Sequence, residues 1–301
     1  MTTGFDQETL LSAERLIEAA LQEDLADVGD LTCLSTLPQQ QTAAVQIVSR
    51  ESGVFCGGQL IALTFSRLQA DVQTELFVSD TEALVPGTVV AEMRGDVRSL
   101  LIGERTILNF LTHLCGISSL TAKYIREVAG THAVVLDTRK TLPGWRRLQK
   151  YAVLCGGGTN HRMGLFDGVL IKDNHLAARG TLSAATAVEA ARAYLQSRQL
   201  PATVEIEVDT LDQLRDVLTA APDIVLLDNM DCATLLRAVE LRNQLAPQTL
   251  LEASGGVSLA TTGEIARTGV DRISVGGLTH SAPALDLGFD WTALASDDAR
   301  N

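Results

Sequence analysis

Six short apolar runs recur through the second half of the chain, and each ends in a polar residue or a glycine. They close at or beside Asp137, Lys172, Glu207, Asp228, Ser254 and Gly277. Helix-like segments such as SAATAVEAARAYLQ lie between most of them, so that strands alternate with helices at intervals of about 20 to 35 residues. This alternation is typical of βα units around a parallel sheet, and strands this apolar are buried on both faces.

The predicted fold class is therefore α/β, with an incomplete parallel α/β barrel built from six or seven such units. An open, doubly wound sheet is the alternative, but no GxGxxG motif follows the first strand. In a barrel the reacting groups lie where the strands end. Here those ends also carry Thr138, Arg139 and Lys140, together with the glycine turns Gly255-Gly256 and Gly276-Gly277.

The first third of the chain has a different pattern of predicted helices and strands. Residues 8–25 have apolar side chains at helical spacing, and strand-like runs follow around residues 43–51, 53–58, 72–78 and 88–95, with one helix at 60–68. Two further helices are expected at 99–115 and 118–129, separated by Gly116. We predict an α+β domain over residues 1–116, a barrel over 117–279, and a C-terminal segment, 280–301, that packs back on the first domain.

Positive charge is concentrated in one part of an acidic chain. Between Arg98 and Lys172 there are eleven Lys and Arg against four Asp and Glu, although the whole chain has a formal net charge of −13. Such segregation is costly unless an anion lies among the cations, so a site for a multiply charged anion is expected. A solvated basic face is the alternative, but Arg139, Lys140 and Lys172 follow apolar strand-like runs directly.

Several classes of protein are disfavoured by the sequence. It has no apolar run long enough for a membrane span and no signal peptide at its N-terminus, so we expect a cytoplasmic protein without a membrane partner. A sequence pI near 4.8 argues against nucleic acid as the main partner. The five cysteines show no CxxC or zinc-ligand spacing, so free thiols are expected, with neither disulfides nor a structural metal.

Glu207 and Asp228 each end an apolar strand, and three interpretations are open. They form an acid/base pair, a Mg²⁺ site that shares substrate oxygens, or structural ion pairs with Lys172 or Lys140. Because several cations share the same ring of strand ends, we favour contact with a metal and with ribose hydroxyl groups.

The loop CGGGTNHRMG places His161 and Arg162 after three glycines, where they are well placed to meet a carboxylate. It lacks the GxxxxGK[ST] pattern of a nucleoside triphosphate site. The turns EASGGVS and ISVGG let backbone N–H groups approach a phosphate closely. Arg105 lies on the flank of its predicted helix, where pairing with Glu104 or with solvent is an equal alternative to a functional role.

Several blocks carry a resemblance to a known family: GERTILNFLTHLCGIS, DTRKTLPGWRRLQKYAVLCGGGTNHRMGLFDGVLIKDNH, VEIEVDT, LLDNM, EASGGV and SVGGLTH. Together with the N-terminal helix and the GDLT turn, they resemble the bacterial quinolinate phosphoribosyltransferases over nearly the whole chain. The resemblance implies the type II phosphoribosyltransferase architecture, with an open-faced N-terminal sandwich and an incomplete barrel. It also implies transfer of a phosphoribosyl group to quinolinate with loss of CO₂, in dimers or multiples of dimers.

The same resemblance implies roles for individual residues. Arg105 from the neighbouring subunit, with Arg139, His161 and Arg162, would hold the two carboxylates of quinolinate. Lys140 and Lys172 would face phosphoribosyl pyrophosphate, and Glu207 and Asp228 its ribose and Mg²⁺, with no organic cofactor. The 5′-phosphate would be held by the two turns Ser254, Gly255, Gly256 and Gly276, Gly277, and Thr138 and Ser274 would also bind substrate. Trp145 departs from the family pattern, in which a smaller aliphatic residue is common, and this bears on loop packing.

Rival interpretations remain at this point. A related pyrophosphorylase of the same fold, acting on nicotinate or associated with molybdenum transport, would use another acceptor; four cations at the acceptor end exceed what one carboxylate needs. A catalytically silent sensor of phosphoribosyl pyrophosphate would be expected to have lost Lys140, Lys172, Glu207 or Asp228. A barrel aldolase would use Lys172 as a Schiff base.

Overall fold

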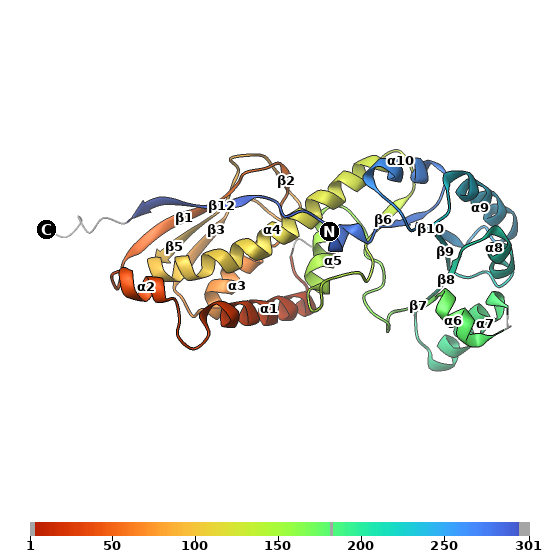
Figure 1. Cartoon of the computed structure of the whole chain (residues 1–301), viewed down its shortest axis with the longest axis horizontal. Helices are drawn as coiled ribbons and strands as arrows, with labels where there is room; N and C mark the ends of the chain where they lie inside the picture. Colours follow the sequence, from red (N-terminus) through yellow and green to blue (C-terminus); the bar gives the residue numbers. More distant parts are fainter. Residues whose placement is uncertain (1–3, 181–182, 295–301) are drawn as a thin grey trace. The chain divides into compact units, whose positions relative to one another are not determined.

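The structure is a computed structural model that describes residues 4–180 and 183–294. Within these residues the chain forms two compact units (Figure 1). The first takes in the described residues up to Ala122, Thr141–Gly157, and the described residues from Thr279 onward. The second takes in Lys123–Lys140 and Gly158–Leu278, apart from residues 181–182. No helix in the described part of the chain is long and apolar enough to cross a membrane.

A four-stranded antiparallel sheet of order β12-β1-β5-β3 forms the centre of the first unit. Its strands are β1 (Thr42–Ser49), β3 (Val72–Leu76), β5 (Val89–Asp96) and β12 (Leu287–Leu294). The C-terminal strand β12 pairs with β1 from Ser49 opposite Leu287 to Ala43 opposite Leu294. Thus the described part of the segment 280–301 belongs to the first unit and its residues 287–294 form an edge strand of the sheet, while residues 295–301 lie outside the described residues. The short strands β2 (Gly53–Val54) and β4 (Ala83–Leu84) form a separate pair.

The first unit also contains helices beside this sheet (Figure 1). They are α1 (Gln7–Leu25), α2 (Leu31–Thr36), α3 (Gln59–Arg67), α4 (Val97–Glu127), of which residues 97–122 belong to this unit, and α5 (Arg146–Cys155). The amphipathic first helix predicted for residues 8–25 is confirmed: Asp6 caps it by accepting from Thr9 N, and Ala13, Ile17 and Leu21 form its buried stripe.

The prediction of two helices separated by Gly116 was wrong, because α4 continues through that glycine as one helix of 31 residues. The reason is tertiary: a Cβ at position 116 would lie 2.1 Å from the carbonyl oxygen of Pro283. Glycine is needed there for the close approach of the chain that leads into β12, not to end the helix.

The second unit contains a six-stranded parallel sheet of order β6-β11-β10-β9-β8-β7, and this confirms the predicted α/β fold class. The strands are β6 (Val134–Leu136), β7 (Gly168–Ile171), β8 (Thr203–Val208), β9 (Ile224–Asp228), β10 (Leu250–Ser254) and β11 (Arg272–Ser274). All six correspond to the apolar runs of the sequence. Since β6 and β7 are the two edges of this order, the described strands form an incomplete barrel.

Helices lie on the outer side of this curved row of strands (Figure 1). They are α6 (Asp173–Arg179), α7 (Ala184–Arg198), α8 (Leu211–Leu218), α9 (Cys232–Leu245) and α10 (Leu259–Arg267), with the short α11 (Gly277–His280) following β11. Each connection returns the chain to the same end of the sheet, so that the carboxyl ends of all six strands meet at one edge.

Candidate active site

A cavity of about 700 Å³ opens at the carboxyl ends of the strands of the second unit. Most of the residues that the sequence predicted for the site line it: Thr138, Arg139, Lys140, His161, Arg162, Lys172, Glu207, Asp228, Ser254, Gly255, Gly256 and Ser274. They come from segments more than a hundred residues apart, and the parallel order of the strands brings them together.

Three predicted residues are not among those that line this cavity in the described part of the chain. Gly276 follows β11, and Gly277 begins α11. Arg105 lies on α4 within the first unit, and its side chain is exposed.

The period of two along a strand explains which side chains face the cavity. On β8 Glu205 and Glu207 share a face, as do Glu252 and Ser254 on β10. On β9 Asp228 lies opposite Ser254 in the register with β10. On β8 and β10, one residue therefore lies at the end of the strand and another lies one step deeper.

Lys172 and Glu207 form an ion pair through Nζ and Oε2. Lys172 follows β7 and is the N-cap of α6, where its backbone N–H donates to Nδ1 of His175 (3.0 Å). This capping fixes the backbone of Lys172, and its side chain reaches the neighbouring strand β8. The interpretation of Glu207 as an ion-pair partner of Lys172 is thus compatible with a place in the cavity.

The turn after β9 lies so close to the turn after β10 that position 255 must be a glycine. The side-chain amide of Asn229 donates to Oδ2 of Asp228 (2.7 Å), and Asn229 itself has a positive φ of 55°. Gly255 has a φ of +86°, and a Cβ there would lie 2.2 Å from Oδ1 of Asn229. Two adjacent loops therefore approach each other closely, leaving backbone of the Gly255-Gly256 turn exposed beside the cavity.

His161 is held by groups that the sequence interpretation did not assign to the site. Its Nε2 lies 3.1 Å from Oε2 of Glu205 and 3.5 Å from Oε1 of Glu252, and both carboxylates are buried. Arg272 donates from Nε to Oε2 of Glu252 (2.7 Å). Burial lowers the pKa of His161, but hydrogen bonds to Glu205 and Glu252 outweigh it and raise that pKa to about 9.

The loop that carries His161 is tied to the end of β6. The buried carboxylate of Asp137 accepts from the backbone N–H of His161 (2.8 Å) and from the side-chain amide of Asn160 (2.6 Å). Arg162 then donates from Nη1 to the carbonyl oxygen of Gly168 (2.8 Å). Burial lowers the pKa of Arg162, and the nearby Arg139 adds to this effect. Two crowded guanidinium groups favour an anionic ligand.

Sequence reasoning missed Glu205, Glu252 and Arg272. A signal was present, because each is an ionisable residue inside an otherwise apolar strand, two positions before a strand-end residue already assigned to the site. Buried charges of this kind are usually paired. What the sequence does not reveal is that β8, β10 and β11 bring these charges to His161.

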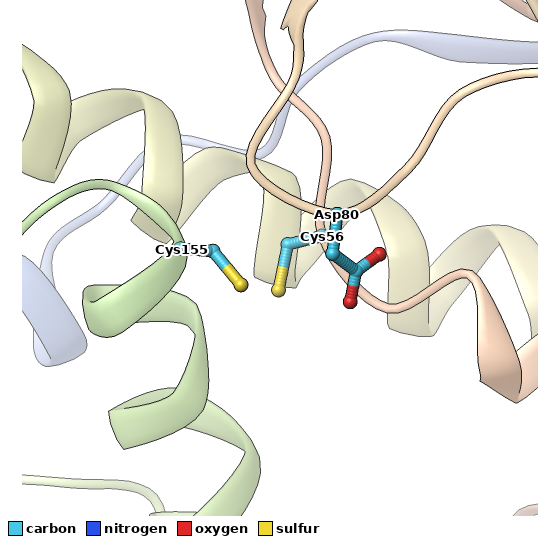
Figure 2. Close-up of side chains that lie close together, drawn as sticks. All are labelled: Cys56, Asp80 and Cys155. Atoms are coloured by element: carbon cyan, nitrogen blue, oxygen red, sulfur yellow. The ribbon is translucent and has the colours of Figure 1, made fainter. Parts of the chain in front are cut away.

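A cluster of side chains that could hold a metal ion lies in the first unit, where the sulfurs of Cys56 and Cys155 point toward one another beside Asp80 (Figure 2). The carboxylate of Asp80 is fully used by the protein: it accepts from Gly57 N (2.9 Å), Gly58 N (3.0 Å) and the hydroxyl of Tyr151 (2.6 Å). Burial raises the pKa of Cys56 well above its ordinary value. The cluster therefore places the buried Cys56 thiol, whose pKa is raised, beside a structural carboxylate that joins two segments.

Comparison with known proteins gives the family of the chain. The model of the quinolinate phosphoribosyl transferase C-terminal domain matches residues 117–290, and that of the N-terminal domain matches residues 30–115. The carboxylating nicotinate-nucleotide pyrophosphorylase of Mycobacterium leprae is 43% identical over 281 residues, covering 93% of this chain and 97% of that protein. The probable enzyme of the same name from Bacillus subtilis is 38% identical over 283 residues, covering 94% of each.

Solved structures agree with the sequence relatives. The nicotinate-nucleotide pyrophosphorylase from Francisella tularensis superimposes with a TM-score of 0.86 at 36% identity, covering 96% of this chain and 98% of the other. Matches to both domain models, at these levels of identity and coverage, extend the similarity beyond the fold alone. The chain belongs to the quinolinate phosphoribosyltransferase family.

Proposed function

We propose that this protein transfers the phosphoribosyl group of 5-phosphoribosyl 1-pyrophosphate to quinolinate and releases nicotinate mononucleotide, CO₂ and pyrophosphate. The observation that carries the proposal is the composition of one cavity, which combines cations at Arg139, Arg162 and Lys140 with carboxylates at Glu207 and Asp228. Membership of the family, and relatives named as carboxylating nicotinate-nucleotide pyrophosphorylases, support it.

The acceptor end of the cavity is assigned to Arg139, His161 and Arg162. Quinolinate is a dianion, and planar guanidinium groups bind carboxylates through two parallel hydrogen bonds. Burial and the nearby charge of Arg139 lower the pKa of Arg162, and a dianion that binds between the two guanidinium groups offsets their repulsion.

The donor end is assigned to Lys140, Lys172 and the glycine turns. The ammonium groups neutralise the pyrophosphate, and exposed backbone N–H groups of the Ser254–Gly256 turn, with Gly276 and Gly277 after β11, hold the 5′-phosphate. Because the nitrogen of quinolinate attacks C1 of the ribose as pyrophosphate leaves, positive charge develops on the sugar and negative charge on the leaving group. Lysines fixed before the reaction stabilise that leaving group.

The carboxylates of Glu207 and Asp228 fit Mg²⁺. Both lie at strand ends in the cavity, and one oxygen of each accepts no hydrogen bond within the described part of the chain. Carboxylate oxygens with water and substrate oxygens are the usual ligands of this ion. When bound, Mg²⁺ would neutralise charge on the pyrophosphate. Decarboxylation needs no organic cofactor, because the quaternary nitrogen of the product accepts the electrons released with CO₂.

A homodimer that shares its active sites is part of the proposal, as is a cytoplasmic location. Arg105 is exposed and does not line the cavity of its own second unit, so in this arrangement a neighbouring subunit provides it. Leu165 and Phe166, which follow Arg162 in the chain, are 73% and 77% exposed. Large apolar side chains this exposed are typical of protein interfaces.

The choice of acceptor is the sharpest test. Purified protein is incubated with phosphoribosyl pyrophosphate, Mg²⁺ and, in turn, quinolinate, nicotinate and nicotinamide, and the nucleotide product is identified by mass. Quinolinate is expected to react, and nicotinamide to react at least about a hundredfold more slowly, because its neutral amide leaves buried cations unpaired at a cost of roughly 3 kcal/mol. Preferred use of nicotinate would instead assign the chain to a related pyrophosphorylase activity.

A further inference from the structure

Four ionisable side chains form a buried set beside the acceptor end of the cavity. His161 contacts Glu205 and Glu252 through Nε2, and Glu252 also binds Arg272. Glu205 is 3% exposed and Glu252 is fully buried. Of the four, His161 and Glu252 line the cavity itself.

We propose that Glu205 and Glu252 are positioning residues, which hold the imidazole ring of His161 through Nε2 so that the ring serves as a hydrogen-bond donor to a carboxylate of the acceptor. The inference rests on the proposed function for the identity of the acceptor, but the arrangement of the ring is tested separately below.

Charge balance supports this role. Buried carboxylates are stable only when cations or donors compensate them. With His161 positively charged, the two cations His161 and Arg272 balance the two carboxylates. With His161 neutral, the set carries a net negative charge next to the place where a dianion binds, which is unfavourable for binding. The protein therefore gains from keeping the ring charged while the acceptor is present.

The second ring nitrogen explains how the ring meets the acceptor. Nδ1 lies 2.7 Å from the backbone N of Arg162, a contact that the neutral ring makes by accepting the hydrogen of that N–H. When the ring is charged, Nδ1 carries a hydrogen of its own and can no longer accept from Arg162. A carboxylate of the acceptor is then the partner that Nδ1 needs, while Nε2 stays with the glutamates.

The charged groups around His161 are consistent with this exchange. They belong to β8, β10, β11, the end of β6 and the loop of His161 itself: Glu205, Glu252, Arg272, Asp137, Arg139 and Arg162. Asp137 accepts from the backbone N–H of His161 and so holds the loop that carries the ring. Arg139 and Arg162 supply the remaining positive charge for a dianion.

The first test follows the ring directly. Protein carrying ¹³C-labelled histidine is titrated by NMR, and the His161 signal is assigned from the spectrum of His161→Gln. The midpoint for His161 in the wild type is expected near pH 9, above the ordinary value of about 6.5. Glu205→Gln and Glu252→Gln should each lower it by about one pH unit or more. A wild-type midpoint at or below the ordinary value, or a midpoint unchanged in both variants, would overturn the inference.

The second test separates positioning from a general structural role. Glu205→Gln is expected to raise the KM for quinolinate by about tenfold to a hundredfold above pH 7.5, with the KM for phosphoribosyl pyrophosphate within about twofold of wild type. Glu205→Asp should recover part of the loss. Glu240→Gln, an exposed position on α9, is the matched control and should change neither constant. Equal increases in both KM values would contradict the positioning role.

Failure of the inference and failure of the proposed function give different results. If the wild type does not use quinolinate at all, the proposed function fails, and the NMR titration still decides the arrangement of His161. If the wild type uses quinolinate and the variants behave as wild type in both tests, only the inference fails.

Discussion

The ammonium group of Lys172, which follows β7, forms an ion pair with the carboxylate of Glu207 on the adjacent strand β8. Both residues line the cavity, and Asp228 lies on the next strand in the sheet. This ion pair fixes the positions of one cation and one carboxylate in the wall of the cavity. Under the proposed function, a substrate that brings pyrophosphate and Mg²⁺ would replace this one ion pair with two interactions, one for Lys172 and one for Glu207.

Lys172→Ala is therefore expected to act mainly on the phosphoribosyl donor or on the rate. Removal of the ammonium group leaves Glu207 without its Lys172 partner and the leaving pyrophosphate with one cation fewer, so kcat should fall by about a hundredfold or more. Steady-state kinetics and calorimetric titration with each substrate measure this. Lys123→Ala, an exposed position on α4, is the control. A loss confined to quinolinate affinity would contradict the assignment.

Arg162→Ala is expected to show the opposite pattern. The variant should lose about tenfold to a hundredfold in affinity for quinolinate, because a charge-assisted carboxylate contact disappears, and should keep its affinity for phosphoribosyl pyrophosphate. Calorimetry on the two substrates separately makes the comparison, with the exposed Arg237→Ala as control. If donor affinity falls while quinolinate affinity stays, the two ends of the cavity have been assigned the wrong way round.

Gly255→Ala tests the glycine turn. Its added Cβ would meet both strain, from a φ of +86°, and overlap with Asn229 at 2.2 Å. Gly130→Ala is matched for strain, with a φ of +84°, but its Cβ would meet nothing within 4 Å. Both variants should lose about 1 kcal/mol or more of stability, and only Gly255→Ala should raise the KM for phosphoribosyl pyrophosphate, by about tenfold. An unchanged KM in Gly255→Ala would remove the turn from the phosphate site.

The proposed sharing of active sites between subunits predicts a result that a self-contained subunit does not. Arg105→Ala and Lys140→Ala homodimers should each be nearly inactive. After the two are mixed and exchange subunits, about half of the dimers are mixed, and each mixed dimer has one intact site, so about a quarter of wild-type activity should return. Exchange is verified with differently tagged subunits. Activity that stays at the level of the separate variants would show that both residues serve a site within one chain.

The elements of the fold that could be predicted were those with a signal in the nearby sequence. Apolar runs that end in Asp137, Lys172 and Asp228 predicted both the parallel strands and the edge where the cavity lies, because the carboxyl ends of such strands meet. The continuous helix α4 was missed, since the need for Gly116 arises from Pro283, far away in the chain. Glycine has the same sequence signature at a helix break and at a close contact.

The candidate site also has a part that could be predicted from the sequence and a part that could not. Strand-end residues were found because position along the strand is visible in the sequence. The contacts of His161 with Glu205 and Glu252 were not, since they depend on the order of β8 and β10 in the sheet and on the path of a loop. Sequence reasoning assigned His161 to the acceptor without the two carboxylates that raise its pKa.

The most direct measurement of the central claim follows both leaving groups in one reaction. Quinolinate labelled with ¹⁴C at its 2-carboxylate is incubated with the protein, phosphoribosyl pyrophosphate and Mg²⁺, and labelled CO₂ and pyrophosphate are quantified over time. The account predicts that the two appear together in equal amounts and only when phosphoribosyl pyrophosphate is present. Pyrophosphate released without labelled CO₂, or no release of either from a folded protein, would contradict it.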